Sequence, residues 1–600
     1  MTIENRSAAS RRPTPTVKLC LVIGLAGAFA LMLINLGHPD LTYWDESFHA
    51  IVARNFLKHP LMMTLYDAPW LSFNRTDWGS SHLWLHKPPL AMWQIALSYL
   101  LFGVNTLALR LPSAALSIAS AYLTYRLAIE LFDNQLAGLL AAWLQAFNPY
   151  IIGAVYGYNF SDHVDVALIF WLEVGFLGLA RGLRLGRTCD FAVAGLGLGL
   201  AFLTKVFPAF IIAGVAVGLW ATKTLWARAP RSWHIRLRDL LVLGGSSLAV
   251  VLPWVAVMWA GYRSEFKRNV ELWLSHLTGN IESWAAPWDR HLFDYLIHEI
   301  PWMYTLAIMA LAYITMRAVR GQRGELFLTL WAWGVLIPFS CAVTKPESAT
   351  LIALPALLLA LSYFLTRALQ SDGELPLAYW AAFAGAWALI PQGESIVVTR
   401  DSLPRVLRIG FAPYLKANIF VVRQLTITVA VVVGGWIGHR FLNGRAVRWM
   451  RLVQRTAAVT VGVVLFGWYV NAAVRVVLLR TGAPSFRTMG TIIRQQFPPN
   501  VVFILDAAVP QHDPQNDGYQ AVLMFWSDRS VYHTAYQLQG QSLSSIAAGI
   551  RSAGGLPFLV TDRSTVPFEA VPGLTEHRFR VYRLPDAINW TPPSSSAKLP

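Results

Sequence analysis

Apolar runs long enough to cross a lipid bilayer recur along most of this 600-residue chain. A transmembrane helix needs roughly 20 mainly apolar residues. Because 55% of the residues are hydrophobic and only 14% are charged, the composition excludes a soluble protein of this length. It predicts an all-α polytopic membrane domain over residues 18–480. We expect about thirteen spans, near residues 18–36, 106–131, 135–155, 166–183, 190–204, 206–222, 239–260, 301–317, 325–343, 349–367, 377–392, 418–438 and 456–478.

Clusters of Lys and Arg between the apolar runs set the expected orientation. If residues 1–17 form a cytoplasmic tail, the basic clusters at 181–187, 223–238, 317–323 and 439–455 all face the cytoplasm. An apolar helix at 88–103 is then expected to lie along the outer membrane surface, because counting it as a span would move these clusters outside. The net charge of +16 therefore reflects membrane orientation and predicts no nucleic-acid partner. The three cysteines lie in or next to predicted spans, so no disulfide framework is expected.

Two polar segments are expected on the outer face. The first is the loop at 37–105, and the second is a small α/β domain at 485–590. Within the latter, the runs at 501–506, 521–526, 556–562 and 578–584 are typical of strands, and 542–554 is typical of a helix. The last residues, 591–600, are expected to be disordered.

Ionisable residues recur near the predicted outer edge of the membrane. The segment "LTYWDESFHA" places Asp45 and Glu46 soon after the first span. Asp162 and Asp165 stand at the start of the fourth span, three residues apart, so they share a face if the segment is helical. The lysines on this side are Lys87, Lys205 and Lys345. Charged groups at membrane depth are costly and usually functional, so we expect these residues to converge on one cavity.

The chemistry of this set suits a phosphate-bearing substrate with a hydroxyl acceptor. Lysine ammonium groups bind phosphate as point charges, and a carboxylate can accept the proton of a hydroxyl. Each residue also has a structural interpretation. An acid pair after a span can cap a helix or face solvent, and a lysine at the edge of a span can snorkel. Histidines of the loop at 262–300 could hold a metal, but they lack tight ligand spacing, and interfacial packing is the better explanation for most of them.

The order of these motifs resembles a known family. The segments "WDESFHAIVARNFL" and "HKPPLAMWQIALSYLLFGVNTLALRLPSA" are similar to the polyprenyl-phosphate-sugar-dependent membrane glycosyltransferases, which include the protein O-mannosyltransferases and the lipid A aminoarabinose transferase. "DVALIFWLEVG", "TKVFPAF" and "TKPESATLIALPALLLAL" resemble the later acidic and lysine segments of this family. The resemblance covers roughly residues 18–370. It implies the C-type glycosyltransferase (GT-C) fold and a multi-pass protein of the bacterial inner membrane whose active site and C-terminal domain face the periplasm.

The resemblance also implies roles for individual residues. Asp45 would be the base or would orient the acceptor, with Glu46 beside it in the acid pair. Asp165 would assist, with Asp162 as the competing choice. Lys87 would hold the donor phosphate, and Lys205 and Lys345 would line the cavity.

The sequence departs from the family at two positions. Phe48 replaces an Arg that relatives often have, which shifts phosphate binding toward the lysines and toward Arg54 or Arg75. His86 replaces an acidic residue before the Lys-Pro turn, so a divalent metal between His86 and His276 is an open alternative to a metal-free site.

We therefore expect a glycosyltransferase that moves a sugar from a polyprenyl-phosphate donor to a lipid, glycan or protein acceptor by an inverting displacement. The chain shows no glycine-rich phosphate-binding loop, so a nucleotide is not expected. A lipid or sugar transporter and a non-catalytic scaffold remain alternatives. The sequence leaves open which sugar moves and which molecule accepts it.

Overall fold

The computed structural model describes most of the chain in a series of segments. The described residues are 13–42, 45–72, 82–158, 162–225, 235–281, 284–288, 290–300, 303–370, 444–478, 485–506, 519–534, 538, 541–588 and 590. The expected spans at 377–392 and 418–438 and the tail at 591–600 lie outside these residues.

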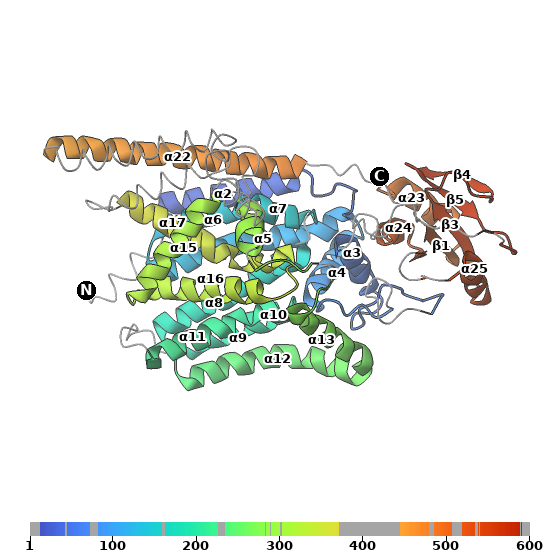
Figure 1. Cartoon of the computed structure of the whole chain (residues 1–600), viewed down its shortest axis with the longest axis horizontal. Helices are drawn as coiled ribbons and strands as arrows, with labels where there is room; N and C mark the ends of the chain where they lie inside the picture. Colours follow the sequence, from blue (N-terminus) through green and yellow to red (C-terminus); the bar gives the residue numbers. More distant parts are fainter. Residues whose placement is uncertain are drawn as a thin grey trace, which may run out of the picture.

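A bundle of apolar helices forms the larger part of the molecule (Figure 1). Its helices are α2 (Pro15–Leu33), α5 (Thr106–Phe132), α6 (Gln135–Ala146), α7 (Pro149–Val155), α8 (His163–Leu185), α9 (Thr188–Phe202), α10 (Val206–Ala209), α11 (Ile211–Leu225), α12 (Leu237–Gly261), α15 (Tyr304–Val319), α16 (Arg323–Cys341), α17 (Leu354–Gln370) and α22 (Gly444–Leu478). Among the described residues, six helices are long and apolar enough to cross a membrane, or seven if the bent pair α6–α7 counts as one. The chain is thus a multi-pass membrane protein, and the expected count of thirteen spans stays a prediction.

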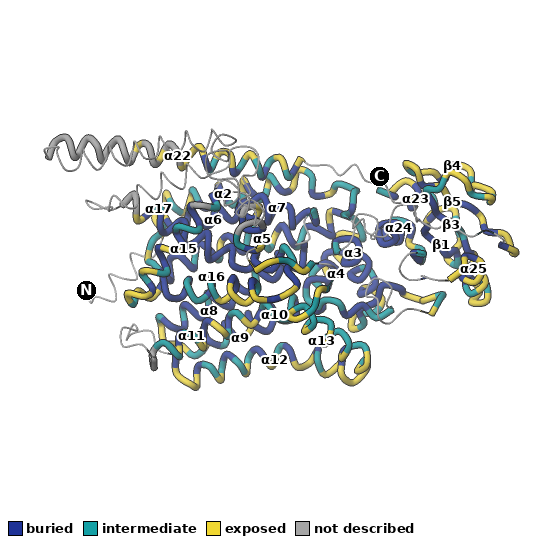
Figure 2. Tube along the Cα trace, viewed as in Figure 1, coloured by how far each residue is buried: buried dark blue, intermediate teal, exposed yellow. Residues whose placement is uncertain are grey.

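Small residues let neighbouring helices of the bundle approach closely. A Cβ added at Gly197 of α9 would lie 2.4 Å from the backbone nitrogen of Gly175 of α8. Helix pairs in membranes rely on such close backbone contact, because lipid provides little hydrophobic drive for association. The buried core of α5, α6, α8, α9, α15, α16 and α17 is continuous, as the dark blue tube in Figure 2 shows.

Shorter elements lie between the bundle and the C-terminal domain. They are α3 (Asp45–Asn55) and α4 (Leu90–Phe102), with α13 (Arg263–Thr278) projecting beside α12 (Figure 1). The 13 residues of α4 are too few for a full span, which agrees with the expected surface position of segment 88–103. Between α13 and α15 lie the π-helix η1 (His291–Tyr295) and α14 (Leu296–Glu299), and before α17 lie the 3₁₀ turns η2 (Glu347–Ala349) and η3 (Leu351–Ala353).

The C-terminal residues fold into a five-stranded mixed sheet with three helices. The strands are β1 (Val501–Asp506), β2 (Ser530–His533), β3 (Leu556–Thr561), β4 (Ala570–Glu576) and β5 (Phe579–Arg583), in the order β2-β1-β3-β5-β4. β1 pairs in parallel with β2 and β3, whereas β5 runs antiparallel to β3 and β4. The helices are α23 (Arg487–Gln496), α24 (Tyr519–Ser527) and α25 (Leu543–Ser552).

One expected strand of this domain is wrong. Residues 521–526 belong to helix α24, in which nearly every side chain is buried. A short apolar run looks alike whether it is a buried strand or a buried helix, and here contacts with α3 and α23 on two sides favour the helix.

Candidate functional site

Helix α3 begins with the acid pair and lies at the end of the bundle that faces the C-terminal domain (Figure 1). Glu46 is buried and forms a bidentate ion pair with Arg110 of α5. The Nε–Oε1 and Nη2–Oε2 distances are 2.7 and 3.1 Å. The backbone nitrogen of Thr42 also donates to Glu46 at 2.7 Å. Burial would raise the pKa of Glu46, but Arg110 and His163 hold it below its ordinary value. Glu46 is therefore an ionised carboxylate that fixes the start of α3.

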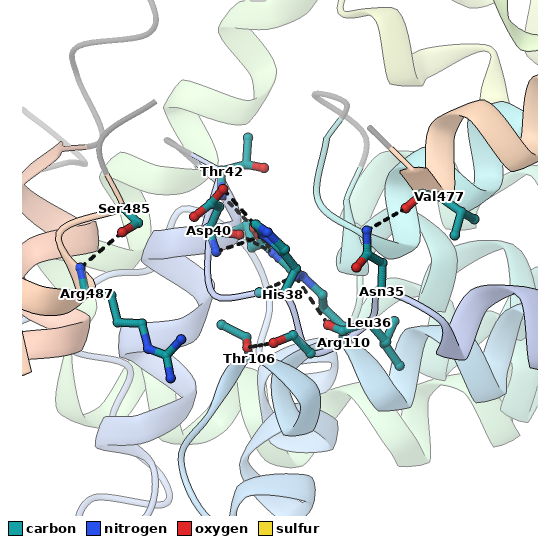
Figure 3. A network of polar contacts seen from close by, with 12 residues as sticks. Asn35, Leu36, His38, Asp40, Thr42, Thr106, Arg110, Val477, Ser485 and Arg487 are labelled. Carbon is teal, nitrogen blue, oxygen red and sulfur yellow. Dashed lines mark hydrogen bonds and ion pairs between the residues drawn. The ribbon is translucent and has the colours of Figure 1, made fainter. Parts of the chain in front are cut away.

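Arg110 also holds the segment that leads into α3. Its guanidinium donates to the backbone oxygens of Leu36, His38 and Asp40 at 3.3, 2.9 and 2.6 Å (Figure 3). Arg110 is fully buried, so its charge is balanced inside the protein by Glu46 and by these carbonyl oxygens. This network sets the place from which Asp45 projects.

Asp45 pairs with Lys87 across the first loop. The Nζ–Oδ2 distance is 2.5 Å, and the side chains are 22% and 12% exposed, respectively. Unlike Glu46, this pair is thus partly accessible. Burial alone would lower the pKa of Lys87, but Asp45 and Asp162 raise it above the ordinary value, so the ammonium stays charged.

The two acids at the start of α8 have different partners. Asp162 is the N-cap of the helix, accepts from the backbone nitrogen of Val164 at 3.0 Å, and forms an ion pair with Nδ1 of His49. Burial would raise the pKa of Asp162, but His49 and Lys87 lower it. Asp165 pairs with Lys205, which precedes α10, at 2.8 Å. Lys205 also donates to the hydroxyl of Ser348 at 3.1 Å.

These groups form one charge cluster, which we call the acid–lysine cluster: Asp45, Lys87, Asp162, Asp165 and Lys205. Lys87 interacts electrostatically with Asp162 and Asp165 as well as with Asp45. The Asp45–Lys87 and Asp165–Lys205 ion pairs are therefore close in space. The three carboxylates and two ammonium groups come from α3, the following loop, α8 and the α9–α10 junction. Segments up to 160 residues apart along the sequence therefore meet at one end of the bundle. This arrangement can bind an anion at the lysines while a carboxylate stands beside it.

His86 and His276 lie next to this cluster. His86 is buried, and burial together with the nearby charges of Lys87 and His276 lowers its pKa well below the ordinary value. Its imidazole is therefore neutral, as a metal ligand must be. Within the part of the chain that the structure describes, no group of three or more His, Cys, Asp or Glu residues could hold a metal ion. The two histidines would thus supply only part of a ligand set.

Two other residues predicted for the donor phosphate donate hydrogen bonds to backbone carbonyl oxygens. Lys345 is buried and donates to the carbonyl oxygens of Ser340, at 2.9 Å, and Ala342, at the C-terminus of α16. Arg54, at the far end of α3, donates to carbonyl oxygens of α24 in the C-terminal domain. The described contacts of Arg54 therefore lie outside the acid–lysine cluster, and a role of Lys345 at the donor phosphate stays a prediction.

Sequence reasoning missed several partners of the predicted acids. His49 lies one helical turn after Asp45, and this spacing could have pointed to it. Arg110 lies in a segment that resembles the family, but the sequence assigned it no role. A buried arginine needs a carboxylate partner, and this rule could have pointed to the pair with Glu46. His163, whose Nε2 lies 3.4 Å from Glu46 Oε1, gave no separate signal in the sequence.

Comparisons with known proteins identify similar sequences and folds. A family profile described as dolichyl-phosphate-mannose-protein mannosyltransferase matches residues 86–259. The undecaprenyl phosphate-alpha-4-amino-4-deoxy-L-arabinose arabinosyl transferase of Pseudomonas aeruginosa is 26% identical over 324 residues, which cover 50% of this chain and 54% of that protein. A second transferase of the same name, from Pseudomonas fluorescens, is 27% identical over 367 residues, covering 58% of this chain and 60% of that protein. The matches thus span little more than half the length of these curated relatives.

Solved structures match over a larger share of the chain. The crystal structure of ArnT from Cupriavidus metallidurans bound to undecaprenyl phosphate aligns with a TM-score of 0.60 and 16% identity, covering 94% of this chain and 97% of that one. The archaeal oligosaccharyltransferase AglB from Archaeoglobus fulgidus aligns with a TM-score of 0.50 and 13% identity, covering 91% and 69%. At these identities the alignments show a shared fold.

Proposed function

We propose that this chain is a membrane glycosyltransferase of the GT-C superfamily, which moves a sugar from a polyprenyl-phosphate donor to an acceptor at the periplasmic side of the inner membrane. The relatives' names favour undecaprenyl phosphate as the lipid and a 4-amino-4-deoxy pentose as the sugar. The family resemblance adds lipid A as the first acceptor to test, ahead of another lipid, a glycan or a protein.

The observation that carries the proposal is the partly exposed Asp45–Lys87 pair. A donor phosphate competes with Asp45 for the ammonium of Lys87, since both are anions and Lys87 has three donors. Binding of the donor therefore releases Asp45 at the moment when the sugar arrives. Lys205, which is 27% exposed and close to Lys87, provides a second cation for the phosphate.

The proposed reaction is a single displacement at the anomeric carbon. Asp45 accepts the proton of the acceptor hydroxyl as the acceptor oxygen bonds to the anomeric carbon. The bond from that carbon to the phosphate oxygen breaks, and its electron pair leaves with the polyprenyl phosphate. The ammonium groups of Lys87 and Lys205 stabilise the charge that develops on the leaving phosphate. Attack opposite to the leaving group inverts the configuration of the sugar.

The other acids, Asp162, Asp165 and Glu46, are positioning residues in this proposal. Asp162 is committed to His49 and to the N-terminus of α8, and Asp165 to Lys205. Asp165 holds Lys205 toward the phosphate and is therefore the better candidate for the assisting acid. Glu46 anchors α3 to Arg110 and keeps Asp45 in place. A divalent metal would take His86 and His276 as two of its ligands and polarise the phosphate, and no step above depends on it.

The test is sugar transfer by the purified protein. Undecaprenyl-phosphate-linked 4-amino-4-deoxy-arabinose and lipid A are incubated with wild type and with Asp45→Asn, and the modified lipid is measured by mass spectrometry. Loss of the base is expected to lower turnover about 100-fold or more. Asp67→Asn is the matched control, because Asp67 pairs with Lys58 in the same loop but is 37% exposed and outside the cluster. Wild-type transfer by folded Asp45→Asn would refute the role of Asp45.

A further inference from the structure

Helix α3 makes ionic contacts at both of its ends. Near its N-terminus, Asp45, Glu46 and His49 pair with Lys87, Arg110 and Asp162. At its C-terminus, Arg54 reaches the C-terminal domain. The helix has only 11 residues, so roughly 15 Å separate the two sets of contacts.

Arg54 binds the C-terminal end of helix α24. Its Nη1 donates to the carbonyl oxygens of Met524 and Phe525 at 3.1 and 3.3 Å and lies 3.1 Å from Oδ1 of Asp528. The last carbonyl groups of a helix lack partners within the helix, and its C-terminus carries partial negative charge. A guanidinium at this position is therefore favourable, and the Arg54 side chain is only 17% exposed.

The loop after α3 forms a second contact with the same domain. Tyr66 stacks on Tyr532 of β2 with ring centroids 4.9 Å apart, and its hydroxyl donates to the carbonyl oxygen of Val531 at 2.9 Å. In return, the backbone nitrogen of Trp70 donates to the hydroxyl of Tyr532 at 2.8 Å. Polar bonds therefore run in both directions across this contact.

Helix α3 and the C-terminal domain also share one hydrophobic core. Ile51 and Val52 of α3 belong to the same buried cluster as Phe525 of α24 and Val531 of β2. A domain joined to a bundle by a flexible linker alone would have a separate core. Here, the C-terminal domain is packed against the helix that begins with Asp45.

We propose that the C-terminal domain positions Asp45 for sugar transfer, and that Arg54 is the positioning residue that couples the domain to α3. This inference rests on the proposed function. Helices shorter than about 12 residues are marginal on their own, so α3 depends on contacts at both ends for its order. Without Arg54, α3 loses its ionic and hydrogen-bond contacts with α24, and Asp45 samples orientations that do not face the acceptor.

The first test compares Arg54→Gln with Arg563→Gln. Arg563 is a matched control, because it pairs with Asp506 at 2.6 Å inside the C-terminal domain and is 15% exposed, close to the 17% of Arg54. We expect Arg54→Gln to lower kcat at least tenfold, with less than a twofold change in donor KM, because a small misplacement of a reacting group lowers the rate strongly. Arg563→Gln should keep the wild-type kcat per folded molecule, even where its melting temperature falls equally.

Hydrogen–deuterium exchange of the α3 amides gives a readout that does not depend on catalysis. Arg54→Gln should exchange residues 45–55 faster than wild type, while Arg563→Gln should leave them unchanged. Unchanged α3 exchange in Arg54→Gln would overturn the inference whether or not the protein transfers sugar. Faster α3 exchange in Arg54→Gln, with no sugar transfer even by the wild type, would refute the proposed function and keep the coupling. Faster exchange with wild-type kcat would overturn the positioning role.

Discussion

Glu46→Gln tests how the start of α3 is held. The substitution removes one charge of a fully buried ion pair and leaves the guanidinium of Arg110 without its counterion. Breaking a buried pair in this way typically costs about 3–5 kcal/mol. Three carbonyl oxygens still accept from Arg110, so we expect the low end of that range, about 3 kcal/mol. Since native proteins are stable by only about 5–15 kcal/mol, the loss is a large share of the total.

The assay is unfolding of the purified protein in mixed micelles of increasing SDS content, followed by tryptophan fluorescence. Glu325→Gln is the control, because Glu325 pairs with Arg317 at 2.6 Å and Arg317 is 25% exposed. Water can solvate Arg317 after the change, so its cost should be about 1–2 kcal/mol. A Glu46→Gln variant within 1 kcal/mol of wild type would refute the anchoring role, and loss of transfer without loss of stability would return Glu46 to the catalytic set.

Two further predictions concern other described residues. Burial lowers the pKa of His533 in β2 from 6.5 to about 4, so its imidazole protonates in the unfolded chain first as the pH falls. The contribution of His533 to the free energy of unfolding is fully present above pH 6.5 and is lost, by up to about 3 kcal/mol, as the pH falls toward 4. In His533→Gln, the melting temperature should therefore depend less on pH in this window. An unchanged slope would show that His533 does not cause the pH dependence. Gly157 has a φ of +71°, and a Cβ there would lie 2.5 Å from Cδ of Glu46. Gly157→Ala should therefore lower both the melting temperature and the rate of transfer, and wild-type values for both would show that Glu46 can move freely.

The helical bundle could be predicted from the sequence because a helix that crosses lipid must be apolar along its own length. Lipid demands about 20 apolar residues per crossing, and most described helices of the bundle lie close to the expected spans. The exception is α22, which begins at Gly444 and not near residue 456. The C-terminal domain was harder, because short apolar runs fit a strand or a helix equally well. Residues 501–506 are a strand as predicted, whereas 521–526 became α24 through contacts with α3 and α23.

The candidate site, like the fold, could be predicted only in part from the sequence. The sequence pointed to Asp45, Lys87 and Asp165, because charged residues beside apolar spans are rare and conspicuous. It could not separate Lys205, which faces Asp165, from Lys345, which bonds to the carbonyl oxygens at the end of α16. Both lysines follow a helix, and which acceptor each one reaches depends on tertiary packing. The contacts of Arg54 with α24 join residues about 470 positions apart, so no local sequence pattern could have predicted them.

Binding of undecaprenyl phosphate is the decisive measurement, because the proposed reaction requires the donor phosphate to replace Asp45 as the partner of Lys87. The affinity of the purified protein for this lipid is measured for wild type, Lys87→Ala and the control Lys58→Ala, an exposed lysine that pairs with Asp67 in the same loop. We expect Lys87→Ala to lose at least about tenfold in affinity, which corresponds to about 1.4 kcal/mol, and Lys58→Ala to keep the wild-type affinity. Equal affinities for wild type and Lys87→Ala would refute phosphate binding by Lys87.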